Sequence, residues 1–234
     1  MSAFPQRRPA FACRIMLAAV APLLTGCDYF RPIEQICERR LVPTEIRVRA
    51  APVEYQTDFT KSAEQLTSMG AATAGGRILG LTHTNMKSSV AFGSNGLTHR
   101  VSGKHCLRPI VNVKLAFEPM TVYVSRGQVE GTCEFNITMD HEMRHVGAFA
   151  AFLADAAPEV ERELRQRFGN QIYYFSSEAE AERHVQSVTR DVLAPYVDES
   201  MKRVIAVQAR IDTPEEYTRL DQFHQSCATG RPGS

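Results

Sequence analysis

The sequence predicts an α+β fold, with an antiparallel β-sheet in the N-terminal half followed by packed helices. Up to about residue 125, apolar and polar residues alternate in short runs that are separated by turn-forming glycines. From Asn136 onward, apolar residues recur with the helical period instead. A content of 44% hydrophobic and 23% charged residues is that of an ordinary globular protein. One domain of this class accounts for the mature chain.

Residues 1–26 have the features of a bacterial lipoprotein signal peptide. Three arginines and no acidic residue accompany the apolar run 15–24, which matches a secretory signal and is too short to span a bilayer. The run ends in Leu-Thr-Gly-Cys, which resembles the lipobox in which the cysteine, here Cys27, is acylated and becomes the first mature residue. We therefore expect a lipid on Cys27. An ordinary signal peptide that ends in Gly-Cys is the alternative.

The rest of the chain is expected to form a short tether, residues 27–40, and a single domain, residues 41–234. Acyl chains on the first mature residue would hold this domain at a membrane, on the periplasmic side of the bacterial cell envelope. The chain has 27 basic and 26 acidic residues, and its net charge of +1 provides no broad basic surface for phosphate backbones. We therefore expect a membrane neighbour and no nucleic acid partner.

Four cysteines remain once those of the signal peptide and the lipid site are set aside. An even number in an exported protein predicts two disulfides. Of the three possible pairings we favour Cys106–Cys133, which would join neighbouring strands, with Cys37–Cys227, which would join the two ends of the domain. A metal site made of these cysteines is disfavoured, because no CxxC spacing is present.

Residue periodicity places the individual elements. Alternation and turn-forming dipeptides predict strands at 45–49, 53–59, 78–82, 90–92, 111–117 and 121–125. In the second half, periodicity and capping residues predict a helix from Asn136 to about 153, a helix from Pro158 to Gly169, a short strand at 172–175, and a helix from Ser177 to about Ile211 that Pro195 should bend.

The segment 141–145 reads His-Glu-Met-Arg-His, which is the HExxH signature. Residues four apart lie on one face of a helix, so His141 and His145 can converge on one tetrahedral zinc ion at ~2.0 to 2.1 Å. Glu142 lies about 100° round the helix, from where it reaches a water on that ion. The two histidines lie away from the apolar stripe of the helix, where a cleft can form. The alternative is a solvated polar face that carries the pattern by chance.

A catalytic zinc site needs a third protein ligand and an open position. The extended metzincin motif would require Gly at 148 and His at 151, and this chain has alanine at both, so that subclass is excluded. The remaining candidates lie later in the chain: Glu178, Glu182, His184, Glu215, Glu216 and His224. Glu182 follows His145 by 37 residues, a spacing typical of sites whose third ligand is a helical glutamate.

The order of these features resembles a bacterial family of predicted secreted zinc-dependent proteases. The similarity covers about residues 45–227: Cys106 ahead of an alternating strand, a second strand, the HExxH helix, a long helix and a closing segment. Members tend to carry tryptophans before the motif and an Asp-Thr-His-Gly-like element after the last helix. This chain has no Trp and reads Asp-Thr-Pro-Glu-Glu at 212–216. The resemblance implies a divergent branch in which Glu216 replaces that histidine as third ligand, ahead of Glu182.

Motif and resemblance together imply a membrane-tethered zinc metallopeptidase of the cell envelope. Zinc would lower the pKa of its bound water toward ~7 and polarise the scissile carbonyl, while Glu142 acts as general base. A peptide or protein substrate is the expected partner, and strand 121–125 is the candidate to pair with it. Tyr123, Tyr217 and Arg144 remain open as groups that could stabilise an oxyanion.

Three other functions are compatible with the same motif. The main alternative is an inactive metal-binding envelope lipoprotein that acts as a binding module. The ion could instead be structural and hold the helices to the sheet. The domain could also cleave another amide, such as a peptidoglycan cross-link.

Overall fold

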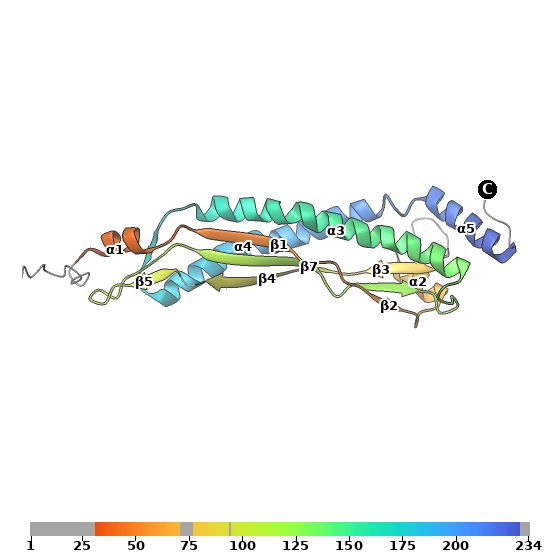
Figure 1. Ribbon diagram of the computed structural model, residues 1–234, viewed down its shortest axis with the longest axis horizontal. Coiled ribbons are helices and arrows are strands. Elements are labelled where there is room, and N and C mark those ends of the chain that lie inside the picture. Colours follow the sequence, from red (N-terminus) through yellow and green to blue (C-terminus); the bar gives the residue numbers. More distant parts are fainter. Residues whose placement is uncertain (1–30, 71–76, 94, 230–234) are drawn as a thin grey trace, which may run out of the picture.

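The α+β class is confirmed: the strands of the N-terminal half form narrow sheets, and long helices follow (Figure 1). The computed structural model describes residues 31–70, 77–93 and 95–229. The predicted signal peptide and the lipid site Cys27 lie outside these residues. None of the described helices combines the length and the apolar character needed to cross a membrane.

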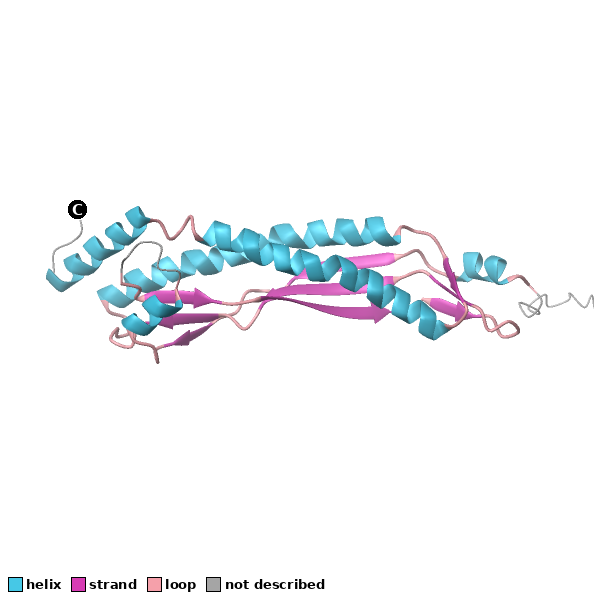
Figure 2. Ribbon diagram, turned by 180° about the vertical axis from the view of Figure 1, so that it is seen from behind, coloured by secondary structure: helices cyan, strands magenta, loops and turns pink. Residues whose placement is uncertain are grey.

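The described part of the chain forms an elongated molecule in which two long helices run beside the strands (Figure 2). In chain order, its elements are α1 (Ile33–Arg40), β1 (Glu45–Ala50), β2 (Gln56–Asp58), α2 (Ala63–Met69), β3 (Gly80–His83), β4 (Met86–Gly93), β5 (Gly96–Thr98), β6 (His105–Leu107), β7 (Ile110–Phe117), β8 (Thr121–Val124), α3 (Cys133–Phe168), β9 (Tyr173–Phe175), α4 (Glu178–Gln208) and α5 (Pro214–Thr229).

The described strands form three sheets, with the orders β1-β7-β4, β2-β8-β3 and β5-β6-β9. The first two sheets lie end to end, because β2 follows β1, β8 follows β7 and β4 follows β3 along the chain (Figure 1). Together they make one long strip of three strands that is interrupted once. The third sheet lies at the end of the molecule near α1.

Both sheets of the strip are mixed, whereas the sequence predicted antiparallel pairing. β1 runs parallel to β7 and β2 runs parallel to β8, while β4 and β3 are antiparallel to their neighbours. Alternation of apolar and polar residues is the same in both kinds of pair, so the sequence pattern does not distinguish them. Strand direction is decided by which distant strand becomes the neighbour.

One helix of 36 residues, α3, replaces the two helices predicted on either side of Pro158. Its N-cap is Thr132 and not Asn136, because the Thr132 side chain accepts the Phe135 N–H. The helix continues through Pro158 because its buried residues form one stripe, and that packing outweighs the lost helical hydrogen bond, about 3 kcal/mol. It ends at Gly169, as predicted, where a φ of 58° suits a residue without a Cβ.

The two halves of α3 pack on the two sheets of the strip. In the first half, Phe135 is buried with Val122 and Val124 of β8. The second half contributes to the largest apolar cluster of the molecule, which it shares with β1, β7 and α4: Phe149, Leu153, Ala156, Val160, Leu164 and Phe168. At about 1.5 Å per residue, the helix is about 54 Å long and spans the interruption between the sheets.

Side chains of α3 also cover the free edge of β1. Glu161 accepts a hydrogen bond from the Val48 N–H at 3.0 Å, and Arg165 donates one to the Ile46 carbonyl at 2.7 Å. The Val48 N–H, with Arg165, holds the pKa of Glu161 below its usual value. The helix is therefore attached to the edge of the sheet as well as to its face.

The two predicted disulfides are present, but the predicted pairing was wrong. The bonds are Cys37–Cys106 and Cys133–Cys227, with Cα–Cα distances of 6.5 and 5.7 Å. Cys106 lies on β6, at the end of the molecule where α1 packs, whereas Cys133 begins α3 at the opposite end (Figure 1). The part of the expected tether from Ile33 to Arg40 is the helix α1, which brings Cys37 to Cys106.

Peptide mapping under non-reducing conditions tests this pairing. We expect one linked peptide that contains Cys37 and Cys106 and another that contains Cys133 and Cys227. A peptide that links Cys106 to Cys133 would contradict the arrangement, because the two ends of the molecule could not then be so far apart.

Truncation of the α3 stripe tests the packing of the helix. Leu164 is 0% exposed in the largest apolar cluster, so Leu164→Ala should lower the free energy of unfolding by roughly 2–5 kcal/mol. Ile205 on α4 is 61% exposed, and Ile205→Ala should change the free energy of unfolding by less than about 0.5 kcal/mol. Urea unfolding of both variants measures the difference, and equal effects would show that α3 is not packed as described.

Candidate metal centre

The HExxH segment lies in the first half of α3 and directs both histidines to one buried point. His141 and His145 are each 6% exposed, and their Nε2 atoms are 3.2 Å apart. This confirms that the spacing of four residues places the two rings on one face of a helix. The rings contact each other edge-on, with centroids 4.9 Å apart.

Asp212 completes the group. It lies in the turn between α4 and α5, and its Oδ1 is 3.1 Å from Nε2 of His141 and 3.1 Å from Nε2 of His145. Ligands at ~2.0 Å from a tetrahedral ion are about 3.3 Å from one another. The three atoms are thus separated by almost the distances that such an ion requires, and the group could hold a metal ion.

The other nitrogen of each ring decides which atoms carry the lone pairs. Nδ1 of His145 contacts Oε1 of Gln208, an oxygen that only accepts, and the Gln208 amide nitrogen donates to the His145 carbonyl. Nδ1 of His141 contacts a carboxylate oxygen of Glu216 at 3.3 Å. Both Nδ1 atoms therefore carry the proton in the neutral rings, which leaves a lone pair on each Nε2.

Three electron-rich atoms consequently face one another in a largely buried place. Burial opposes ionisation of Asp212, but a proton on either Nε2 would donate to its Oδ1 and charge the ring, and this effect of His141 and His145 outweighs burial and holds the pKa of Asp212 well below the usual value. The hydroxyl of Tyr217 donates a further hydrogen bond to Oδ1 of Asp212 at 3.3 Å. Two imidazole lone pairs and an anion so close together repel one another unless a cation or a proton lies between them.

Glu142 lies beside this group and is only 2% exposed. Its Oε2 accepts a hydrogen bond from the Thr82 hydroxyl of β3 at 2.7 Å. The next residue on the same face of that strand is Gly80, where an added Cβ would come within 2.6 Å of Oε1 of Glu142. A glycine is therefore required for β3 to approach the carboxylate so closely. Burial raises the pKa of Glu142, against the opposing effect of the two histidines.

A small cleft opens next to Glu142, between β3, α3 and α5. Its walls come from all three elements and from the residues just before β3: Arg77, Leu79, Gly80, Thr138, His141, Glu142, Tyr217, Leu220, Asp221 and His224. Tyr217, whose hydroxyl contacts Asp212 of the metal group, also lines this cleft. The carboxylate and the metal group are thus reached from the same side.

The third-ligand prediction of Glu216 is corrected by this arrangement. Glu216 contacts Nδ1 of His141 and so lies behind the ring, not at the point where the two Nε2 atoms meet. It also forms ion pairs with Arg144 and Arg219, and its hydrogen bond to Arg219, reinforced by His141 and Arg144, lowers its pKa to about 2. Glu216 lies in the first turn of α5, whereas Asp212 precedes this helix.

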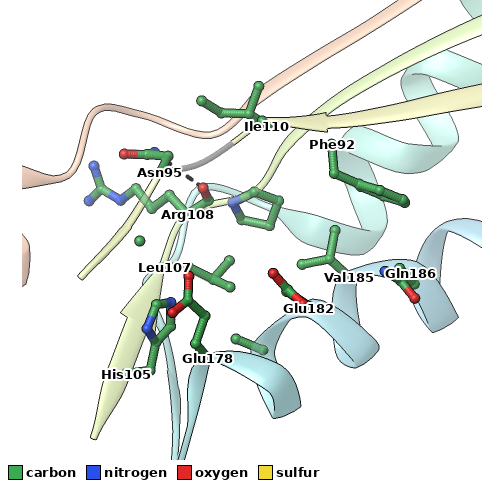
Figure 3. A pocket seen from close by; sticks show the side chains of 14 residues that line it. Phe92, Asn95, His105, Leu107, Arg108, Ile110, Glu178, Glu182, Val185 and Gln186 are labelled. Atoms are coloured by element: carbon green, nitrogen blue, oxygen red, sulfur yellow. Dashed lines mark hydrogen bonds between the residues drawn. The ribbon is translucent and has the colours of Figure 1, made fainter. Parts of the chain in front are cut away.

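The runner-up, Glu182, lies far from the metal group. Figure 3 shows Glu178 and Glu182 on α4, lining a pocket with His105, Leu107 and residues of β4 at the opposite end of the molecule. α3 and α4 are antiparallel, so the start of α4 faces the end of α3 and not the HExxH segment. The spacing argument for Glu182 therefore failed.

The remaining candidates are also placed outside the metal group. His184 contacts the rings of Tyr173 and Phe175, with centroids 5.2 Å away in both cases. Glu215 is exposed in the first turn of α5, and His224 lines the cleft beside Glu142. Sequence reasoning missed Asp212, although the Asp-Thr element of the family resemblance contained it.

The prediction that strand 121–125 pairs with substrate was also wrong. Residues 121–124 form β8, which is the central strand of its sheet and is hydrogen-bonded on both sides, to β2 and β3. A central strand has no free edge for another chain. The strand beside Glu142 is β3, and no further strand pairs with its second edge among the described residues.

Zinc binding by matched variants tests the ligand assignment. Asp212→Ala removes a ligand and should weaken zinc binding more than about 100-fold, while Glu216→Gln removes only the support behind His141 and should cost roughly 10–100-fold. Glu182→Gln should leave binding unchanged. Competition against a chromophoric chelator measures the affinities, and a loss of zinc in Glu182→Gln but not in Asp212→Ala would overturn the assignment.

Comparison with known proteins gives no match. No family model matches the chain, and no curated protein and no solved structure is significantly similar to it. The resemblance to secreted zinc-dependent proteases therefore stays a prediction, and the function has to be argued from the metal group and Glu142.

Proposed function

We propose that this protein is a zinc-dependent metallopeptidase of the bacterial cell envelope. The observation that carries the proposal is the convergence of His141, His145 and Asp212 on one point beside the buried carboxylate of Glu142. Two imidazoles and one carboxylate are a donor set that catalytic zinc accepts, with a fourth position left for the reaction. The three donors come from α3 and from the turn before α5, so the folded chain is needed to assemble them.

A bound zinc ion would supply Lewis acidity, both to activate water and to polarise a carbonyl. Glu142 would accept the proton of the attacking water and later deliver it to the leaving amine. The Thr82 hydroxyl holds one oxygen of this carboxylate, which leaves Oε1 for the proton. Because burial raises the pKa of Glu142, the carboxylate is a stronger base than one in water.

Tyr217 is the best placed of the three groups considered for oxyanion stabilisation. Burial, with the nearby charge of Asp212, raises the pKa of Tyr217, so its hydroxyl stays protonated and can donate. Arg144 is instead paired with Glu216 behind the His141 ring, and Tyr123 lies on the central strand β8. Tyr217 also lines the cleft beside Glu142.

An extended peptide is the substrate that the surroundings favour. The second edge of β3 pairs with no other described strand, and β3 contacts Glu142 through Thr82. A peptide added to that edge would lie along the cleft, with its backbone hydrogen-bonded to β3. Two disulfides agree with an exported protein, as does the lipobox-like sequence that ends at Cys27.

A metal-binding module without activity is the second candidate. It is favoured by the burial of Glu142, which is 2% exposed and closely approached by β3. Such a module would bind zinc through the same three residues and would not depend on Glu142. The two functions therefore differ in what the loss of this carboxylate does.

Replacement of Glu142 by glutamine separates them. Glu142→Gln should keep zinc and lower hydrolysis of a quenched fluorescent peptide mixture by more than about 100-fold, because an amide cannot accept the proton of water. Glu182→Gln, on the distant pocket, is the matched control and should keep both properties. Zinc bound by the wild-type protein with no hydrolysis of any peptide would favour the binding module, and full activity of Glu142→Gln would exclude the proposed peptidase.

A further inference from the structure

The two disulfides differ in exposure and in what they hold. Cys37 and Cys106 are both 0% exposed and lie in an apolar cluster with α1. Cys133 is exposed at the first residue of α3, and Cys227 is half-buried near the end of α5. A thiol reagent in solution can reach the second bond directly, while the first is covered.

The helix that Cys227 holds has little else to keep it in place. Among the described residues, α5 contains no buried side chain, whereas α3 and α4 each bury a continuous set. Apolar burial is what normally fixes a helix on a domain. The end of α5 is held by the bond to Cys133, and its beginning is held by polar contacts at the metal group.

Those polar contacts are the ones that complete the metal group. Asp212 lies two residues before α5, and Glu216 and Tyr217 lie in its first turns. These residues supply the third ligand, the support behind His141 and the hydroxyl donor. Any displacement of α5 on α3 therefore moves the carboxylate away from the two histidine Nε2 atoms.

We propose that the Cys133–Cys227 bond is a thiol–disulfide exchange site that controls whether the metal group is complete. The partner is a dithiol: one thiolate attacks a sulfur of the bond and forms a mixed disulfide, and the second thiol then displaces the remaining sulfur. The protein gains two thiols by a two-electron reduction, and the dithiol becomes a disulfide. Without the bond, α5 separates from α3 and Asp212 leaves the histidines, so zinc is released. The inference rests on the proposed zinc site.

Limited reduction of the folded, oxidised protein tests the exposure argument. The protein is treated with a low concentration of a phosphine reductant, alkylated and desalted, and its cysteines are mapped by mass spectrometry. Cys133 and Cys227 should be alkylated while Cys37–Cys106 stays intact. Equal reduction of both bonds, or reduction of Cys37–Cys106 first, would overturn the proposal.

Hydrogen exchange then tests the displacement of α5 without any metal. In zinc-free protein, peptides that cover 209–229 should exchange faster after reduction than before, while peptides from α1 should not change. The double variant Cys133→Ser/Cys227→Ser, which carries no alkyl groups, should show the same pattern with unchanged far-UV circular dichroism. Unchanged exchange at 209–229 in both would show that the bond does not hold α5.

Zinc affinity tests the coupling. Zinc should bind the reduced protein and the Cys133→Ser/Cys227→Ser variant at least about tenfold more weakly than the oxidised protein. Cys37→Ser/Cys106→Ser is the matched control and should bind as tightly as the wild type. Equal affinity with and without the Cys133–Cys227 bond would overturn the proposal. If the oxidised protein bound no zinc, the proposed function would be contradicted. The hydrogen-exchange test of how α5 is held would still stand, because it is made on zinc-free protein.

Discussion

Burial of one apolar stripe of α3 against two consecutive sheets is the interaction on which the rest of the structure depends. The sheets share a strand order but are interrupted between β1 and β2, β7 and β8, and β3 and β4. α3 crosses that interruption and contacts strands on both sides of it. The same helix carries the HExxH segment within its buried face, where His141, Glu142 and His145 lie between the apolar residues of its two halves, whereas the sequence predicted a face away from the apolar stripe. Packing in the second half of α3 therefore determines how the histidines of the first half are presented.

The metal centre combines a rigid part with a weakly anchored one. The histidines and Glu142 belong to a helix that is buried along most of its length, and β3 supports Glu142 at close range. Asp212 belongs to a turn between two helices, the second of which has no fully buried side chain among the described residues. In a low-dielectric place, the mutual repulsion of the three donors is largest when no cation is present. A metal ion bound at this group would therefore be linked to the position of α5, because each would stabilise the other.

What the sequence could predict here follows from the range of each signal. His141, Glu142 and His145 are related by helical spacing alone, so their arrangement was predictable. Most strands were too, because alternation is local. Asp212 lies 67 residues beyond His145, and its approach depends on the antiparallel packing of α3 and α4, which no local pattern encodes. The predictions of strand direction for β1 and β7 and of the cysteine pairing were wrong for the same reason.

Pro158 shows the opposite failure, in which a correct local rule was overruled by packing. The proline favours a helix start, yet the residues on both sides of it continue one buried stripe, and the helix is not interrupted.

The Asp-Thr element is a third case. The resemblance that contained it directed attention to the position of a missing histidine, Glu216, and away from the aspartate that is present in this chain.

The covered edge of β1 has a consequence for self-association. Glu161 and Arg165 occupy the outer edge of β1, and on the opposite edge the Met86 N–H of β4 donates to the sulfur of Met201 on α4. Unpaired strand edges are templates on which identical chains stack into intermolecular sheets and fibres. The outer edge of β1 offers no such template where Glu161 and Arg165 occupy it. Crowded copies of the protein are thereby hindered from adding a strand to β1.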